Sequence, residues 1–193
     1  MLAIASGHLR EAEVSAALDG GKLGRFVALD ADADSLREVE TNYASKGAET
    51  VHAFGPPPPG AQGQSWDFDF VYAAGLFDYL AGNVAQALTA RMFAMTGPGG
   101  QMLVPNFAPQ VRDRACMETF TDWHLSYRDE YHMAALAEGL DPEEIESYDV
   151  YSGPAGSVVY LVVKERKLME EPWRSIGGPS ALFACTPPGG EAS

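Results

Sequence analysis

The chain has few cysteines and no long hydrophobic run. Its 193 residues include two cysteines, Cys116 and Cys185, which are too few and too far apart for a disulfide framework or a zinc cluster. No apolar stretch approaches the roughly 20 residues of a membrane-spanning helix. The first residues also lack the cationic segment of a secretory signal. These absences predict a cytoplasmic protein without a membrane segment.

Basic residues are scarce as well. The chain has 13 Lys and Arg against 27 Asp and Glu, a formal net charge of −14. Binding to nucleic acid or to an anionic membrane depends on Lys and Arg, so the composition disfavours both and favours a small-molecule partner. A homo-oligomer is compatible with it. Because 46% of the residues are hydrophobic, the chain can bury a core, and we expect a single domain.

The motifs of several enzyme classes are missing. His8, His52, His124 and His132 do not have the spacing of metal ligands, and no metal is expected. There is no GxSxG segment of a hydrolase and no phosphate-binding Walker loop.

Apolar runs that alternate with helical patterns are the main signal that is present. We expect strands at residues 2–5, 25–30, 49–54, 66–74, 101–107, 147–152 and 157–164. One helix is expected after Gly7, with Val14, Ala17 and Leu18 on one face. A second, with Leu36 on its buried face, is expected to be capped by Asp34 or Ser35.

Two further helices are expected in the second half of the chain. One covers about Asn83–Met95 and places Val84, Leu88, Met92 and Met95 on one face. Gly97-Pro98-Gly99-Gly100 ends it. The other covers Arg112–Ala137, interrupted, if anywhere, near Ser126-Tyr127.

This order of elements predicts an α/β fold. Strands that alternate with helices form a doubly wound, mostly parallel sheet with helices on both faces. The last two strands are separated by a short Gly153–Gly156 turn, which predicts an antiparallel C-terminal pair. We expect residues 1–164 to form the core. Residues 165–193 are charged at first and then rich in Gly and Pro, which is typical of a loosely attached tail.

The start of the chain is a candidate ligand site. A strand that ends at Ala5-Ser6-Gly7 and leads into a helix is the usual cradle of a doubly wound domain. Glycine allows a ligand to approach the backbone, and a helix start offers free N–H groups. The same pattern also fits an ordinary turn without a ligand.

Further residues are expected at the same edge of the sheet, because the carboxyl ends of parallel strands meet there. Asp30 ends the second strand, where its carboxylate can accept hydrogen bonds from a ribose diol. Ala31 and Asp32 follow, and Asp32 is expected to assist at the ribose or adenine. The next strands end in Ala53-Phe54 and Ala74-Gly75. A capping or loop-opening role for Asp30 stays open.

Together these segments resemble the class I S-adenosylmethionine-dependent methyltransferases. The resemblance rests on the Ala5-Ser6-Gly7 turn, Asp30, Asp69-Phe70-Val71-Tyr72, and Gly97-Pro98-Gly99-Gly100 before the fifth strand. It implies a Rossmann-like methyltransferase fold and S-adenosylmethionine as cofactor. Residues 75–80 and 122–128 are similar to a bacterial branch that makes 3-hydroxy fatty acid methyl esters.

The chain departs from the family in two places. The family's first motif has several glycines, whereas Gly7 stands alone here. In the family, helices that precede the first strand commonly cover the cofactor, and no sequence precedes Met1. We therefore expect a core that lacks the usual N-terminal cover.

The resemblance also indicates where the methyl acceptor binds. The turns after the fourth and fifth strands and the long helix are expected to form its pocket, with the substrate-binding residues Phe77, Tyr79, Asn106 and Trp123. Three further residues are catalytic candidates. His124 can take a proton, and Tyr127 or Arg128 can orient a carboxylate. Packing and surface roles remain open for each residue. Trp123 and Tyr127, four positions apart, are expected on one helix face.

The leading hypothesis is methyl transfer to a small apolar or aromatic molecule. One alternative is a non-catalytic relic, or a partner-binding subunit, of the same fold. The other is an NAD(P)-binding oxidoreductase, although the first turn lacks the glycines that let a pyrophosphate approach.

Overall fold

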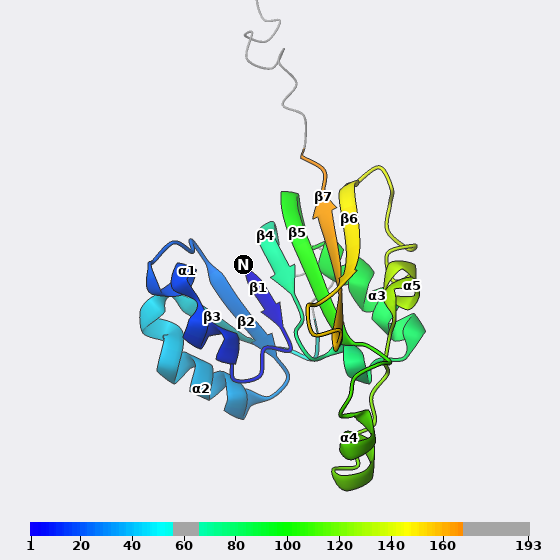
Figure 1. Ribbon diagram of the computed structural model, residues 1–193. Coiled ribbons are helices and arrows are strands. Elements are labelled where there is room, and N and C mark those ends of the chain that lie inside the picture. The colour runs from blue at the N-terminus through cyan, green and yellow to red at the C-terminus, as the bar shows by residue number, and fades with distance from the viewer. Residues whose placement is uncertain (56–65, 168–193) are drawn as a thin grey trace, which may run out of the picture.

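The computed structural model describes residues 1–55 and 66–167, and most of the tail expected at residues 165–193 lies outside these ranges. A single seven-stranded sheet runs through the molecule in the order β3-β2-β1-β4-β5-β7-β6 (Figure 1). The first five strands are parallel, and β7 lies antiparallel between β5 and β6. This confirms the predicted fold class. The strands are β1 (Leu2–Ile4), β2 (Phe26–Asp30), β3 (Ala48–His52), β4 (Phe68–Tyr72), β5 (Thr96–Phe107), β6 (Ile145–Ser152) and β7 (Val158–Glu165).

Helices lie on both faces of the sheet (Figure 1). On one face lie α1 (Ala16–Asp19) and α2 (Ala33–Tyr43), and on the other lie α3 (Gly82–Phe93) and α5 (Glu130–Ala135). A short helix, α4 (Arg114–Phe120), projects beyond the carboxyl ends of the parallel strands. Short 3-10 turns are η1 (Arg10–Val14), η2 (Ala44–Lys46) and η4 (Phe77–Tyr79).

Alternate residues of β1, β2 and β5 enter two separate apolar clusters, because successive strand side chains point to opposite faces. On the α1 and α2 side, Ala28 of β2 packs with Leu18 and Leu36. On the α3 and α5 side, Met102 of β5 packs with Met92 and Leu161.

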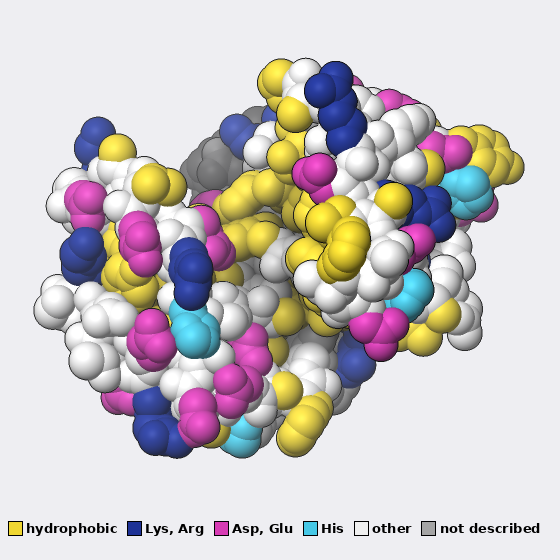
Figure 2. Space-filling view, turned by 60° about the horizontal axis from the view of Figure 1, so that its bottom comes forward, with side chains coloured by type: hydrophobic (Ala, Val, Ile, Leu, Met, Phe, Trp, Pro, Cys, Tyr) yellow, Lys and Arg dark blue, Asp and Glu magenta, His cyan; other side chains and the backbone are white. Residues whose placement is uncertain are grey.

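The α1 and α2 face of the sheet is covered over only part of its width. In Figure 1 these helices lie over β2 and β3, whereas no helix among the described residues lies in front of β4, β5 and β7. Phe70 and Leu103 on this side are only partly buried. Figure 2 shows hydrophobic side chains gathered in the hollow between the part that holds α1 and α2 and the rest of the molecule.

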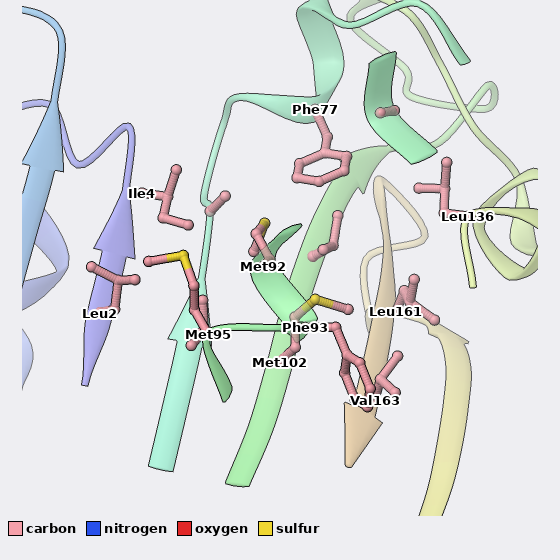
Figure 3. Packing of buried hydrophobic residues seen from close by; sticks show 14 of the residues in the cluster. Leu2, Ile4, Phe77, Met92, Phe93, Met95, Met102, Leu136, Leu161 and Val163 are labelled. Carbon is pink, nitrogen blue, oxygen red and sulfur yellow. The ribbon is translucent and has the colours of Figure 1, made fainter. Parts of the chain in front are cut away.

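On the opposite face the core is closed. Figure 3 shows Leu2 and Ile4 of β1, Met92 and Phe93 of α3, and Leu161 and Val163 of β7 arranged in one layer. All of these side chains are buried. This layer anchors the strand ends that carry the candidate site.

The prediction of a helix directly after Gly7 is wrong. The chain forms the 3-10 turn η1 and then the four-residue helix α1, which Ser15 caps through its side chain. Val14, expected on the same face as Leu18, is 85% exposed while Leu18 is buried. The physical reason is the extended backbone of Ser15, which breaks the helical path and turns the two segments apart.

The prediction of one long helix over Arg112–Ala137 is also wrong. This part of the chain forms two short helices, α4 and α5, joined by residues 121–129 without regular structure. The break is therefore longer than a kink near Ser126-Tyr127, and Trp123 and Tyr127 do not share a helix face. Hydrogen bonds to β5 and to η4 hold this segment, with Arg128 N–H donating to Phe107 O at 3.0 Å and Ser126 N–H donating to Asp78 O at 2.6 Å.

Two smaller expectations need correction. The cap of α2 is Asp32, whose carboxylate accepts the N–H groups of Asp34 and Ser35. On α3 the fully buried residues include Ala85, Thr89 and Met92, whereas Val84 is about half exposed. A face of α3 is therefore left available to a cavity at the sheet edge.

Candidate functional site

The candidate site lies where the strand order reverses, between β1 and β4. In open α/β sheets, ligands bind beyond the carboxyl ends of the strands at this position. The turn after β1 meets the ends of β2 and β4 there. Residues expected at the cofactor from the sequence therefore come together at one edge of the sheet.

The turn after β1 is tightly folded. Ala5, Gly7 and Leu9 all have left-handed backbones, with φ of 51°, 50° and 54°. Ser6 N–H donates to Leu29 O at 3.2 Å, and Leu9 N–H donates to Ser6 O at 2.9 Å. These N–H groups are used within the chain, so the turn offers a ligand fewer donors than a helix start would.

Asp30 ties this turn to the end of β2. One oxygen, Oδ2, accepts Gly7 N–H at 2.7 Å, and the other, Oδ1, accepts Asp32 N–H at 2.8 Å. A carboxylate oxygen can accept more than one hydrogen bond, so both oxygens keep capacity toward a ligand. The loop-opening role and the ribose role are therefore compatible in the same carboxylate.

Asp32 is committed to α2. Besides capping the helix, its Oδ2 accepts the Ser35 hydroxyl at 2.6 Å. The Ser35 hydroxyl and the Asp34 N–H group hold the pKa of Asp32 below its usual value. Its predicted assistance at the ribose stays a prediction, and its carboxylate is largely occupied by the cap.

A cavity of about 510 Å³ opens beside these residues, and we call it the edge cavity. Five residues of the predicted cofactor set line it, namely Ala5, Asp30, Ala31, Ala53 and Phe54. The opposite wall is formed by one side of α3 and the residues before it. Those lining residues are Leu76, Leu80, Val84, Ala87, Leu88 and Arg91. The exposed side of α3 thus lines the edge cavity.

Two glycines and an unpartnered serine hydroxyl lie at this edge of the sheet, at the ends of β1 and β4. The Ser6 hydroxyl oxygen is buried and has no hydrogen-bond partner among the described residues. Gly7 and Gly75 have open space where a Cβ atom would lie. Ala74 and Gly75 line a second cavity on the β4 side, so the two cavities flank neighbouring strand ends.

The second cavity, of about 570 Å³, lies on the open face of β4, β5 and β7, and we call it the face cavity. Its floor is formed by side chains of these strands, and Asn106 and Phe107 lie at its outer end. The floor residues are Phe70, Tyr72, Leu103, Pro105, Val158 and Tyr160.

The expected acceptor residues divide into an exposed pair and buried ones. Trp123 Nε1 donates to the Tyr79 hydroxyl at 2.7 Å, and both rings are partly exposed. The Trp123 ring also meets the Phe107 ring edge to face, with centroids 6.3 Å apart. Phe77, in contrast, is fully buried in the core. The aromatic pair is therefore continuous with the outer end of the face cavity.

Arg128 is buried and bonded to the chain itself. Its guanidinium donates to Phe77 O at 2.7 Å, to Leu80 O at 2.6 Å and to Asn106 Oδ1 at 2.6 Å. Burial lowers the pKa of Arg128. These bonds hold the η4 turn against β5, which is a positioning role, and they leave little capacity for an acceptor carboxylate.

The two other catalytic candidates lie apart from the cavities. His124 is exposed and has Asp122 as its partner, at 3.1 Å. The Tyr127 hydroxyl is buried without a hydrogen-bond partner among the described residues, and the Arg114 guanidinium lies 4.4 Å from its ring centroid. Burial and the nearby Glu118 raise the pKa of Tyr127. Neither residue lines the edge cavity or the face cavity.

Sequence reasoning missed Asp78. This residue follows β4, is 5% exposed, and lines the face cavity. Its Oδ1 accepts Phe107 N–H at 2.7 Å. The signal in the sequence was a single acid within the apolar Gly75–Leu80 segment, which periodicity alone does not distinguish from an exposed turn residue.

Solved structures of methyltransferases resemble this one. Human N-acetylserotonin methyltransferase in complex with S-adenosylmethionine matches with a TM-score of 0.62 and 12% identity, over 86% of this chain and 47% of that one. An O-methyltransferase family protein from Burkholderia thailandensis matches with a TM-score of 0.59 and 13% identity, over 86% and 50%. The fold is that of the class I S-adenosylmethionine-dependent methyltransferases. DhpI, solved with SAH, matches with a TM-score of 0.53 and 18% identity, over 86% and 76%.

The likeness to methyltransferases is one of fold. The sequence matches no family of known proteins and no curated protein. The chain spans about half the length of the human and Burkholderia proteins.

The residues at the edge fit the adenosyl part of the cofactor that this methyltransferase fold implies. Asp30 would accept the ribose hydroxyls, and the edge cavity beside Ala53 and Phe54 would hold the adenine. The orphaned Ser6 hydroxyl and the open space at Gly7 and Gly75 would face the methionyl part.

In residues 1–55 and 66–167, no group of three or more His, Cys, Asp or Glu side chains is arranged to hold a metal ion. Within the same ranges, every helix is too short or too polar to span a bilayer.

Proposed function

We propose that this chain binds S-adenosylmethionine at the edge cavity and transfers its methyl group to a small apolar or aromatic molecule. The observation that carries the proposal is the convergence of Asp30, Ala31, Ala53 and Ala5 on one cavity at the point where the strand order reverses. The methyltransferase fold supports this assignment.

The cofactor, when bound, supplies a methyl group on a positively charged sulfur. The chain's own residues then need only bind, orient and exclude water, because a sulfonium methyl reacts readily with a positioned nucleophile. Asp30 orients the adenosyl part, and the apolar floor of the face cavity excludes water from the acceptor. Arg128 keeps the turn between the two cavities in place.

The acceptor is proposed to be small and apolar or aromatic. The face cavity has an apolar floor, and the Trp123 and Tyr79 rings extend its outer end. Aromatic faces also attract a sulfonium.

The alternatives have less support. A non-catalytic relic is not favoured, because the edge retains both a cavity and an acid at the ribose position. An NAD(P)-dependent oxidoreductase would need free backbone N–H groups at the first turn for a pyrophosphate, whereas those of Ser6, Gly7 and Leu9 are bonded within the chain.

Calorimetry with S-adenosylhomocysteine and with NAD tests the proposal. We expect the former to bind and the latter not to bind. Asp30→Ala should weaken S-adenosylhomocysteine binding by about 1.5–3 kcal/mol, as expected for hydrogen bonds to a charged group. The matched control is Asp34→Asn in the first turn of α2, which lies outside the predicted cofactor set and should leave the affinity nearly unchanged.

Asp30 also holds Gly7 and Asp32, so a second variant separates binding from local structure. Asp30→Asn keeps an oxygen for one of these N–H groups while it removes the charge. An unchanged affinity in folded Asp30→Ala and Asp30→Asn would refute the ribose assignment. Binding of NAD in place of S-adenosylhomocysteine would refute methyl transfer.

A further inference from the structure

The face cavity combines apolar walls with few polar side chains. Its floor is made by the side chains of β4, β5 and β7, and Figure 2 shows the hydrophobic side chains that gather in this hollow. Among its lining residues, Glu11 and Asp78 are the two with charged side chains. An apolar cavity with few, well-placed polar groups is the usual form of a small-molecule site.

Glu11 is already paired. Its Oε1 accepts a hydrogen bond from the Tyr72 hydroxyl at 2.6 Å. Burial of the Tyr72 hydroxyl raises its pKa, and this hydrogen bond raises it further. The two side chains satisfy each other on the wall that η1 forms. Glu11 is exposed, so its other oxygen, Oε2, is hydrated, and the residue closes one side of the cavity without needing a donor from a ligand.

Asp78, by contrast, has one oxygen to spare. Its backbone oxygen accepts Ser126 N–H at 2.6 Å and its Oδ1 accepts Phe107 N–H at 2.7 Å, so the residue is fixed in place. No other described residue donates to Oδ2. The nearest cation, Arg128, spends its N–H groups on the carbonyl oxygens of Phe77 and Leu80, on either side of Asp78, and on Asn106.

The environment of this carboxylate favours a donor. Burial raises the pKa of Asp78, although the Phe107 N–H group and the charge of Arg128 oppose the shift. An acceptor on the wall of an apolar cavity has few partners other than water, and a ligand that donates a hydrogen bond to it can replace that water.

We propose that the face cavity binds an apolar, ring-sized molecule whose hydroxyl or amino group donates a hydrogen bond to Oδ2 of Asp78. This inference rests on the proposed function, because it takes the bound molecule to be the methyl acceptor. Asp78 lies four residues after Ala74 and three after Gly75, which border the cofactor edge. The donor group is therefore held on the side of the cavity nearest the cofactor.

Two naphthalene probes of similar size test the proposal by calorimetry. The probe 1-naphthol can donate a hydrogen bond, and 1-methoxynaphthalene cannot. We expect the wild-type chain to bind 1-naphthol at least about tenfold more tightly, in line with a hydrogen bond to a charged acceptor.

Three variants make the test specific to Asp78 and to the cavity. Asp78→Asn keeps an oxygen for the Phe107 N–H group and turns an NH₂ toward the ligand, so the preference for 1-naphthol should be lost. Glu11→Gln, at the other charged position, should preserve the preference. Leu103→Trp fills the floor of the cavity and should weaken the binding of both probes.

Several results would overturn the proposal. These are equal binding of the two probes to the wild-type chain, no binding of either probe up to its solubility limit, a preference that persists in folded Asp78→Asn, or binding that Leu103→Trp leaves unchanged. Titration of the same preparations with S-adenosylhomocysteine is a separate readout. Its failure would refute the proposed function, while the probe titrations would still decide the role of Asp78.

Discussion

Ala5 holds a backbone conformation that residues with a side chain rarely adopt. Its φ is 51°, and the left-handed region costs an L-residue roughly 1–2 kcal/mol. The methyltransferase family commonly has glycine in this turn, and here the backbone keeps the glycine conformation with alanine in place. Such strain at the edge of a candidate site is typical of turns that the surrounding structure holds in shape.

Ala5→Gly should therefore stabilise the chain. Relief of the strain outweighs the added entropy of the unfolded chain, and we expect a gain of about 0.5–1 kcal/mol in the free energy of unfolding. Urea unfolding followed by circular dichroism measures it. The control is Ala3→Gly, two residues earlier in β1, where the backbone is extended and a buried methyl group is lost. That variant should be less stable than the wild type. A loss of stability in Ala5→Gly would contradict the argument.

Arg128 has a different role in the structure from the one its sequence position suggests. In the sequence it is an exposed-looking cation that could orient a substrate. In the structure its guanidinium donates to the backbone oxygens of Phe77, Leu80 and Ser126 and to the side-chain oxygen of Asn106. The residue contributes by holding η4, and through η4 Asp78, against β5.

At the scale of elements, β5 begins earlier than its sequence indicates. The Gly97-Pro98-Gly99-Gly100 segment belongs to β5, and the pairing with β4 is irregular between Phe68 and Phe70. A Cβ atom on Gly100 would lie 2.7 Å from Phe68 O and 2.9 Å from Gly97 O. The glycine is needed for this close approach of two backbones.

Gly100→Ala should therefore destabilise the chain. The added methyl group forces β4 and β5 apart, and overpacking of this kind costs about 1–3 kcal/mol. The matched control is Gly82→Ala at the start of α3, where a Cβ atom meets open space. Alanine is the better helix former, so that variant should be at least as stable as the wild type. Equal stability of the two variants in urea unfolding would rule out the proposed crowding.

Two segments of the resemblance, residues 75–80 and 122–128, contact each other in the structure. Trp123 bonds to Tyr79, Ser126 to Asp78, and Arg128 to Phe77 and Leu80. Their likeness to the branch that makes 3-hydroxy fatty acid methyl esters stays a prediction. The contacts indicate that the two segments act as one structural unit at the outer end of the face cavity.

For the whole molecule, the charge imbalance has a measurable effect. The folded chain gathers a net charge of −14 into a small volume, and this self-repulsion favours unfolding. Salt also weakens attractive ion pairs. Pairs such as Arg25 with Glu49 lie on the surface, however, and surface pairs contribute little to the free energy of unfolding. Screening of the repulsion should therefore be the larger effect.

We expect the urea midpoint to rise when NaCl is raised from about 0.01 M to about 0.15 M, because the Debye length falls from about 30 to about 8 Å. Near the sequence pI of about 4.5 the net charge vanishes, and the salt effect should vanish with it. A midpoint at neutral pH that falls with salt would show that attractive ion pairs dominate instead.

The alternation of strands and helices, the parallel sheet and the antiparallel β6 and β7 pair could all be predicted from local residue patterns. Apolar runs of strand length must be buried on both faces, and helices between them provide the cover. The same patterns also placed Asp30, Ala31 and Ala53 at one edge, because strand order and direction follow from that alternation.

Tertiary structure alone decided the length of the helices and the roles of single polar residues. The Arg112–Ala137 pattern is interrupted because its middle bonds to β5 and η4, segments distant in the sequence. Gly7 N–H is taken by Asp30, 23 residues away, and Asp78 is buried by strands that follow it in the chain. Hydrogen bonds and burial of this kind depend on which distant groups come within about 3 Å, which local periodicity does not specify.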